Sequence, residues 1–70
     1  MQINWIEGFE IAVKTTEKET VISANREGLL SLAAVLKTLA EGAPGDHIHL
    51  DEFNSLDAGS AELIIEKTDG

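Results

Sequence analysis

The sequence predicts an α+β fold in the order ββαββ, with one helix packed on one face of a four-stranded, mainly antiparallel sheet. One segment has the spacing of an amphipathic helix, and four short segments have strand-like composition. The 70 residues suit a single domain (1–70) with two layers. A helix of about 16 residues is about 24 Å long, close to a seven-residue strand, so one helix can cover one face.

Two strands are predicted before the helix. Around residues 9–14, apolar Phe9, Ile11 and Val13 alternate with other residues, which is typical of a half-buried strand. Residues 20–24 are rich in β-branched side chains and return after a turn at residues 16–19. The two segments therefore form a hairpin.

A helix is predicted from about Arg26 to Glu41. Asn25 is placed to cap its first turn, and Gly42 is typical of its end. Gly28 is unfavourable within a helix, so we expect close helix–sheet packing there. The predicted core stripe contains Leu29, Leu32, Ala33, Leu36, Leu39 and Ala40, with Ser31 on the solvated side. Leu30 and Val35 lie off this stripe and are expected to be exposed, as contacts for a partner or a weak homodimer.

Two more strands are predicted after the helix, at about residues 46–52 and 61–67, joined by a loop with turn-forming residues. The sheet residues expected to meet the helix are Phe9, Ile11, Val13, Ile22, Ile48, Leu50, Leu63 and Ile65. A single helix leaves the other face of the sheet open. That face is expected to carry Ala12, Val21, His47, His49, Asp51 and Ile64.

The segment from His47 to Phe53 is the most informative part of the chain. If it is a strand, alternation places His47, His49 and Asp51 on one face and Ile48 and Leu50 on the other. Two imidazoles and a carboxylate are ligands that suit zinc. The same pattern also fits an ordinary solvated sheet face, and no second ligand cluster is present in the sequence. We therefore expect no cofactor, and a metal site at these three residues remains a weaker alternative.

Catalysis is not predicted. Ser55 and Ser60 lie in turn-forming sequence, and neither belongs to a nucleophile elbow. The acidic ends of 51–62 resemble a calcium loop, but Phe53 and Leu56 occupy positions that need an oxygen ligand and a glycine. We expect a protein that is not an enzyme.

The composition narrows the class of partner. There are 13 acidic and 5 basic residues, a formal net charge of −8. This charge argues against nucleic acid and suits a basic protein surface, although acidity also favours solubility alone. The sequence has no cysteine for disulfides, no apolar run near the roughly 20 residues of a membrane span, and no signal-peptide pattern at its start. We expect a cytoplasmic protein with no membrane association.

Several short motifs resemble those of the immunity protein 32 family of small bacterial proteins. They are Gly28-Leu29-Leu30, the run from Pro44 to Asp51, Gly59-Ser60 and the run from Glu62 to Ile65. The resemblance spans about residues 25–66. It implies a non-enzymatic protein that binds and neutralises a toxin encoded beside it in a polymorphic toxin system.

On this interpretation, an acidic surface meets a basic toxin domain. The residues predicted to lie in or near the contact are His47, His49, Asp51, Glu52, Phe53, Glu62, Glu66 and Trp5. Trp5 and Phe53 suit interface anchors, but they equally suit plugs at the ends of a small core. A small metal-binding domain and a homo-oligomeric structural protein remain the alternatives.

Overall fold

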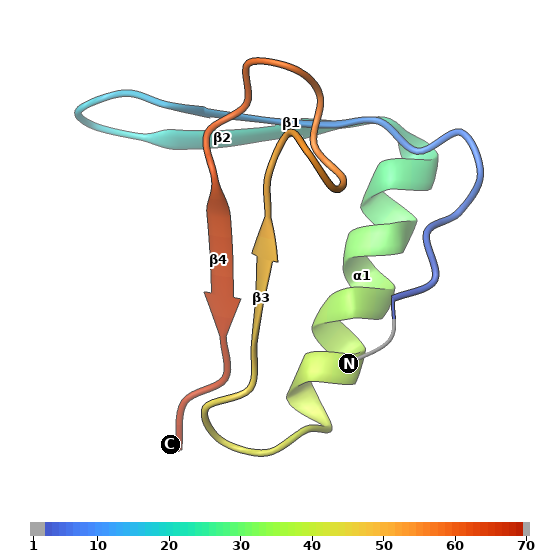
Figure 1. Ribbon diagram of the computed structural model, residues 1–70, viewed down its shortest axis with the longest axis vertical. Helices are drawn as coiled ribbons and strands as arrows, with labels where there is room; N and C mark the ends of the chain where they lie inside the picture. Colours follow the sequence, from blue (N-terminus) through green and yellow to red (C-terminus); the bar gives the residue numbers. More distant parts are fainter. Residues whose placement is uncertain (1–2, 70) are drawn as a thin grey trace.

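The computed structural model describes residues 3–69, which form one helix and two hairpins (Figure 1). In chain order the elements are β1 (Ile11–Thr15), β2 (Thr20–Ala24), α1 (Arg26–Ala40), β3 (His47–Leu50) and β4 (Leu63–Glu66). The predicted α+β class and the order ββαββ are confirmed. No helix in this range is long and apolar enough to cross a membrane.

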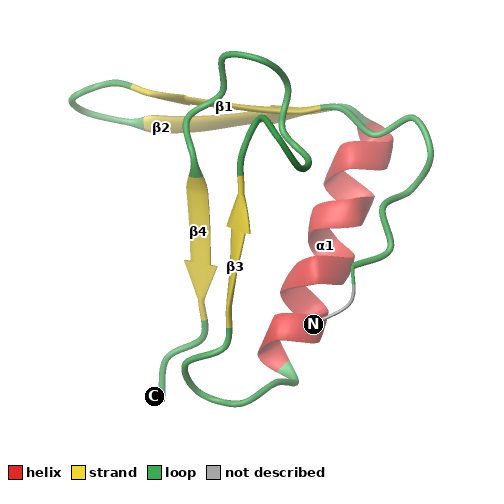
Figure 2. Ribbon diagram, viewed as in Figure 1, coloured by secondary structure: helices red, strands yellow, loops and turns green. Residues whose placement is uncertain are grey.

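The four strands form two separate antiparallel sheets of two strands each, and the prediction of one four-stranded sheet is wrong. In the first sheet Val13 of β1 lies opposite Ile22 of β2, and in the second His49 of β3 lies opposite Ile64 of β4. Figure 2 shows the two hairpins crossing each other, with α1 beside β3. The helix therefore packs against two short hairpins that meet at an angle.

The edge of β1 that does not pair with β2 is occupied by another segment, and this keeps the two sheets apart. The loop before β4 runs along this edge, where the N–H groups of Asp57 and Ala61 donate to the carbonyls of Ile11 (2.8 Å) and Val13 (2.9 Å). The N–H of Val13 donates in turn to the hydroxyl of Ser60 at 3.1 Å. Since these bonds occupy the edge of β1, neither β3 nor β4 can pair with it.

The core lies where the helix, both hairpins and the loop before β4 meet. Its cluster of buried side chains contains Ile11, Val13, Leu32, Val35, Ile48, Leu50 and Leu56. All four strand residues in this set were predicted. Phe9, Leu63 and Ile65 are half-buried against its edge. The prediction for Ile22 is wrong, because this residue, in the middle of β2 and opposite Val13, is 44% exposed.

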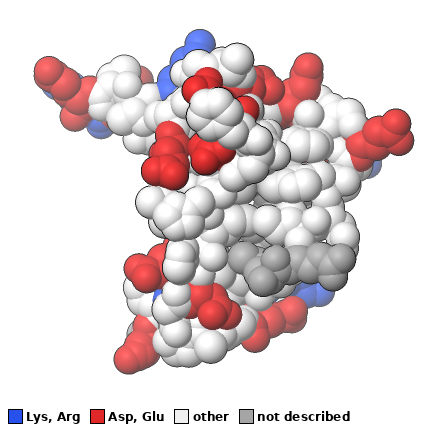
Figure 3. Space-filling model, in the orientation of Figure 1, with Lys and Arg blue, Asp and Glu red and all other residues white. Residues whose placement is uncertain are grey.

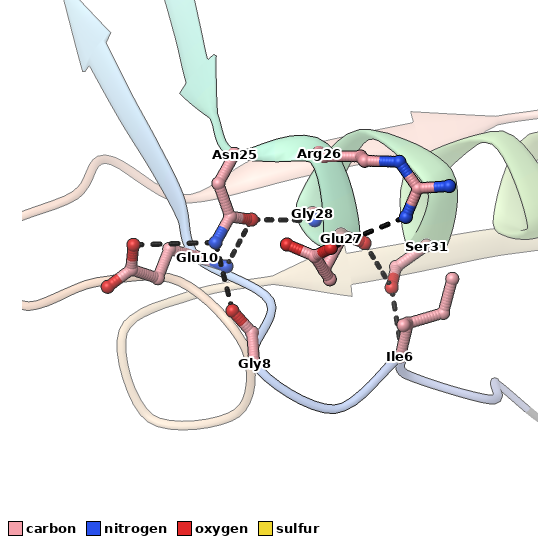
Figure 4. Close-up of polar contacts among 8 residues, drawn as sticks. All are labelled: Ile6, Gly8, Glu10, Asn25, Arg26, Glu27, Gly28 and Ser31. Atoms are coloured by element: carbon pink, nitrogen blue, oxygen red, sulfur yellow. Dashed lines mark hydrogen bonds and ion pairs between the residues drawn. The ribbon is translucent and has the colours of Figure 1, made fainter.

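Asn25 caps the helix as predicted and also connects it to the strand before (Figure 4). Its Oδ1 accepts hydrogen bonds from the N–H groups of Gly28 (2.8 Å) and Glu10 (3.0 Å). Its Nδ2 donates to the carbonyl of Gly8 at 2.9 Å. One side chain thus holds the start of α1 against the chain entering β1.

Gly28 lies where the helix packs closely against the start of β1. A Cβ atom at this position would be 2.5 Å from the carbonyl oxygen of Glu10 and 2.9 Å from Cγ1 of Ile11. Only glycine fits there without displacing the strand, which confirms the predicted close packing.

The helix is rotated relative to the predicted stripe. Its buried residues are Gly28, Ser31, Leu32, Val35 and Leu39. Leu29 and Leu36 were predicted to be buried and are 55% and 49% exposed, and Ala33 and Ala40 are also exposed. Val35 was predicted to be exposed and is 2% exposed, whereas Leu30 is 42% exposed as predicted. The core thus uses the helix face centred on Gly28, Leu32 and Val35.

Ser31 supports this rotation. It was predicted to be solvated, but the structure buries it completely. Its hydroxyl accepts a hydrogen bond from the N–H of Ile6 at 2.9 Å and donates to the carbonyl of Glu27 at 2.8 Å (Figure 4). Because both bonds are satisfied, a small polar side chain can occupy the buried face.

We predict that Gly28→Ala destabilises the fold, although alanine favours a helix over glycine by about 1 kcal/mol. The added methyl group has no room beside Glu10, and overpacking of this kind costs about 1–3 kcal/mol. Urea denaturation followed by circular dichroism measures the change. Thr38→Ala, at an exposed position of the same helix, is the control. Gly28→Ala that is as stable as wild type would contradict the packing described.

Candidate binding surface

The outer face of the β3–β4 hairpin carries the two histidines. His47 and His49 are exposed, whereas Ile48 and Leu50 between and after them are buried, so the predicted alternation along the strand is confirmed. Across the hairpin His47 lies opposite Glu66, and His49 lies opposite Ile64, which is 53% exposed. The face therefore combines imidazole, carboxylate and aliphatic groups.

Two contacts organise the imidazoles. The ring centroids of His47 and His49 lie 5.0 Å apart in an edge-to-face arrangement. Nδ1 of His49 lies 3.6 Å from Oε2 of Glu62, and both side chains are about half exposed, at 51% and 54%. An exposed pair of this kind contributes little to stability. These groups are therefore available to a partner.

Asp51 does not belong to this row of side chains. β3 ends at Leu50, and the half-buried Asp51 turns into the loop, where its Oδ1 accepts from the N–H of Phe53 at 2.9 Å. The predicted grouping with His47 and His49 is thus lost. Within residues 3–69, no group of three or more potential ligand side chains is arranged to hold a metal ion.

Phe53 is the most exposed large apolar residue in the described chain, at 90%. It lies in the loop between β3 and β4, beside Glu52 and Asn54. Exposing an aromatic ring to water is unfavourable, and aromatic side chains are enriched among the residues that dominate protein interfaces. The sequence left open whether Phe53 plugs the core, and the structure places it outside.

The loop that presents Phe53 is held by a dense set of hydrogen bonds. The carbonyl of Asp51 accepts from the N–H groups of Asn54, Ser55 and Leu56 at 2.9–3.3 Å. The Asn54 side chain accepts from the N–H of Asp51 (3.1 Å) and donates to the carbonyl of His49 (3.1 Å). Leu56, 5% exposed, anchors the loop in the core. Phe53 is therefore displayed on an ordered turn.

Glu52, near the start of the same loop, bonds to the far end of the loop. Its Oε2 accepts a hydrogen bond from the N–H of Gly59 at 2.8 Å, which links the Phe53 turn to the segment that bonds to β1. Gly59 has a positive φ of 84°, a conformation that favours glycine. The Glu52 carboxylate thus has a structural bond in addition to its exposed charge.

Trp5 lies elsewhere. It stacks on Phe9 with ring centroids 4.8 Å apart and planes inclined by 19°, and it packs against the edge of the core. The N-terminal segment runs along α1, where Ile6 bonds to Ser31. Figure 1 shows this segment on the side of the helix away from β4. Trp5 is thus separated from the face that carries the histidines.

The charge of this region is uniform. Residues 47–66 contain five carboxylates and no lysine or arginine: Asp51, Glu52, Asp57, Glu62 and Glu66. Figure 3 shows acidic side chains along the upper and lower rims of the face in view, around a largely uncharged middle. Phe53 and Ile64 therefore lie within a strongly acidic part of the chain.

A hollow of about 370 Å³ adjoins His47 near the end of the helix. It is lined by Thr38, Leu39, Gly42, Gly45, Asp46 and His47. The carboxylate of Asp46 accepts from the N–H of Ala43 at 2.9 Å, so it is engaged in the turn. Nδ1 of His47 lies 3.2 Å from the carbonyl of Gly45. The hollow offers a partner a recess beside one imidazole.

Comparison with known protein families gives a match that includes this region. The sequence model described as Immunity protein 32 matches residues 19–68, which include both β3 and β4, the loop between them, and the whole helix. The chain belongs to the immunity protein 32 family. No curated protein and no solved structure matches it.

Family membership assigns a general role. Immunity proteins bind a protein toxin and neutralise it, and as a class they are not enzymes. The matched range contains every candidate contact residue except Trp5, and it contains the helix cap Asn25 and the loop that carries Phe53. The motifs from Gly28 to Ile65 that carried the resemblance all lie within this range.

We predict that Asn54→Ala loosens the loop without unfolding the protein. The substitution removes the partners of the Asp51 N–H and the His49 carbonyl, and each lost bond costs about 1 kcal/mol. Amide exchange at Phe53, Ser55 and Leu56 should accelerate about fivefold or more. Exchange in the β1–β2 hairpin is the internal control, and an equal acceleration there would indicate global destabilisation instead.

Proposed function

We propose that this chain neutralises a cognate toxin in the cytoplasm by covering a basic surface of it with the β3–β4 hairpin and its loop. The observation that carries this proposal is that Phe53 is 90% exposed on an ordered loop, in a segment (residues 47–66) that has five carboxylates and no lysine or arginine. An immunity protein needs a contact that is specific and fast, and this region has the chemistry for both.

Phe53 supplies an anchor for this contact. The hydrogen bonds to Asp51 and Asn54 hold the loop before a partner arrives, so little conformational entropy is lost on binding. An exposed ring on such a loop can enter an apolar recess of the toxin. Ile64 on the neighbouring strand adds aliphatic surface.

The carboxylates supply attraction and orientation. A uniform negative field accelerates the encounter with a basic surface and disfavours wrong orientations. His47 and His49 lie among these carboxylates. Toxin surfaces that bind anionic substrates are basic, so a negatively charged cover would compete directly with such a substrate.

We predict that Phe53→Ala weakens binding to the toxin encoded by the neighbouring gene by about 2 kcal/mol, or roughly 30-fold. The unfolding midpoint should not change, because the ring is almost fully exposed. Isothermal titration calorimetry measures the affinity. Val21→Ala removes a 46% exposed aliphatic group from β2 and serves as the control. Equal affinities for both variants and the wild type would remove Phe53 from the contact.

We also predict that Glu62→Lys slows association with the same toxin by about tenfold at low ionic strength. Glu17→Lys, in the turn between β1 and β2, produces the same change in net charge at a distant site. Stopped-flow measurements at two salt concentrations separate a local effect from an overall one. If Glu17→Lys slows association as much as Glu62→Lys, the toxin does not dock on the β3–β4 hairpin.

A further inference from the structure

The helix exposes a second apolar face that the core does not use. Leu29, Leu30 and Leu36 are 55%, 42% and 49% exposed, and Ala33 and Ala40 are also exposed. Isolated exposed leucines are ordinary, but a group of them on one helix face marks an interaction site. This face belongs neither to the core nor to the β3–β4 hairpin.

The spacing of these residues is that of a helix–helix contact. Leu29, Ala33, Leu36 and Ala40 follow one another at intervals of four, three and four residues, so Leu29 and Leu36 are seven apart, as are Ala33 and Ala40. Such a seven-residue repeat with apolar residues at two positions is the pattern by which helices pack along their length. The small side chain of Ala33, at the middle, allows close approach, with axes about 8 Å apart.

The rest of the molecule leaves this face open. The N-terminal segment covers the other flank of the helix, where Ile3 and Asn4 line a small hollow with Ala34, Val35 and Thr38. Leu29, Ala33 and Leu36 lie on the opposite flank, and their exposure shows that no described segment covers them.

We propose that this face binds the same face of a second copy of the chain, as an antiparallel pair of α1 helices related by a two-fold axis at Ala33. Such an axis places residues equally distant from position 33 opposite each other. Leu29 then lies beside Leu36 of the second copy on one side of Ala33, and Leu30 packs along the aliphatic stem of the second copy's Lys37 on the other side. This arrangement gives each of the three exposed leucines an apolar contact with the second copy.

Charge complementarity favours this partner and this direction. Arg26 begins the helix and Glu41 follows its end, so an antiparallel pair places Arg26 beside the Ala40–Glu41 end of the second helix. In one copy the Arg26 side chain is 78% exposed and lies 3.4 Å from the carboxylate of Glu27.

The size of the face sets the strength of the pair. A helix of 15 residues is about 22 Å long, so the contact is smaller than the roughly 800 Å² per partner of a standard interface. The net charge of −8 also opposes association of two copies. We therefore expect a reversible dimer that forms at high protein concentration and physiological salt, where distant charges are screened.

Sedimentation equilibrium of the full chain over a wide concentration range tests the proposal. The average mass should rise toward that of a dimer. Ala33→Glu places two carboxylates together at the two-fold axis and should weaken the dimer at least about tenfold. Ala34→Glu makes the same change one residue along, on the flank near Ile3, and should leave the dimer intact. Circular dichroism verifies that both variants keep their helix.

A charge exchange tests the antiparallel direction. Arg26→Glu and Glu41→Arg should each weaken the dimer, and the double variant should restore it. Neither change harms the helix dipole, since an acidic residue suits the N-terminus and a basic residue the C-terminus. A strictly monomeric wild type, or a dimer indifferent to Ala33→Glu, overturns the proposal. A monomer whose toxin binding is lost in Ala33→Glu assigns this face to the toxin instead.

Discussion

The junction between the helix and β1 determines how the rest of this chain is arranged. Asn25 connects the first turn of α1 to Gly8 and Glu10, and Gly28 brings the helix axis close to β1. Once this contact forms, the rotation of the helix is set, and the buried Ser31 bonds reinforce it. That rotation decides which apolar residues enter the core and which remain for partners. Because the helix has more apolar residues than one face can bury, the choice has functional consequences.

A second constraint is the edge of β1, which the loop before β4 occupies. By bonding to Ile11 and Val13, this loop separates the two hairpins and at the same time fixes the end of the turn that displays Phe53. Leu56 compensates for the lost strand pairing by entering the core from the loop. The feature that divides the sheet is thus also the one that positions the candidate anchor, so the predicted binding loop depends on tertiary contacts made far from it.

These two constraints explain what the sequence could and could not predict. Local signals were sufficient for the strands, the Asn25 cap and the alternation of His47 with Ile48, because each depends on neighbours within a few residues. The burial of Val35 in place of Leu36 was not predictable from periodicity, since two overlapping apolar stripes were present and only the Gly28 contact selects between them. The division of the sheet depends on hydrogen bonds across more than 40 residues, and no local pattern reports those.

The two proposed contacts use opposite chemistry, and this allows them to coexist. The segment from His47 to Glu66 holds five carboxylates and no lysine or arginine, whereas the outer face of the helix has Arg26 and Lys37 among leucines. In the proposed binding mode the carboxylates attract a basic toxin surface to the first of these, whereas the apolar residues of the second are proposed to bind another copy of the chain. Because the two surfaces are on different elements, a pair joined through α1 would still present both β3–β4 hairpins. One dimer would then bind two toxin molecules, one on each β3–β4 hairpin, and the contact between the two α1 helices would stay the same.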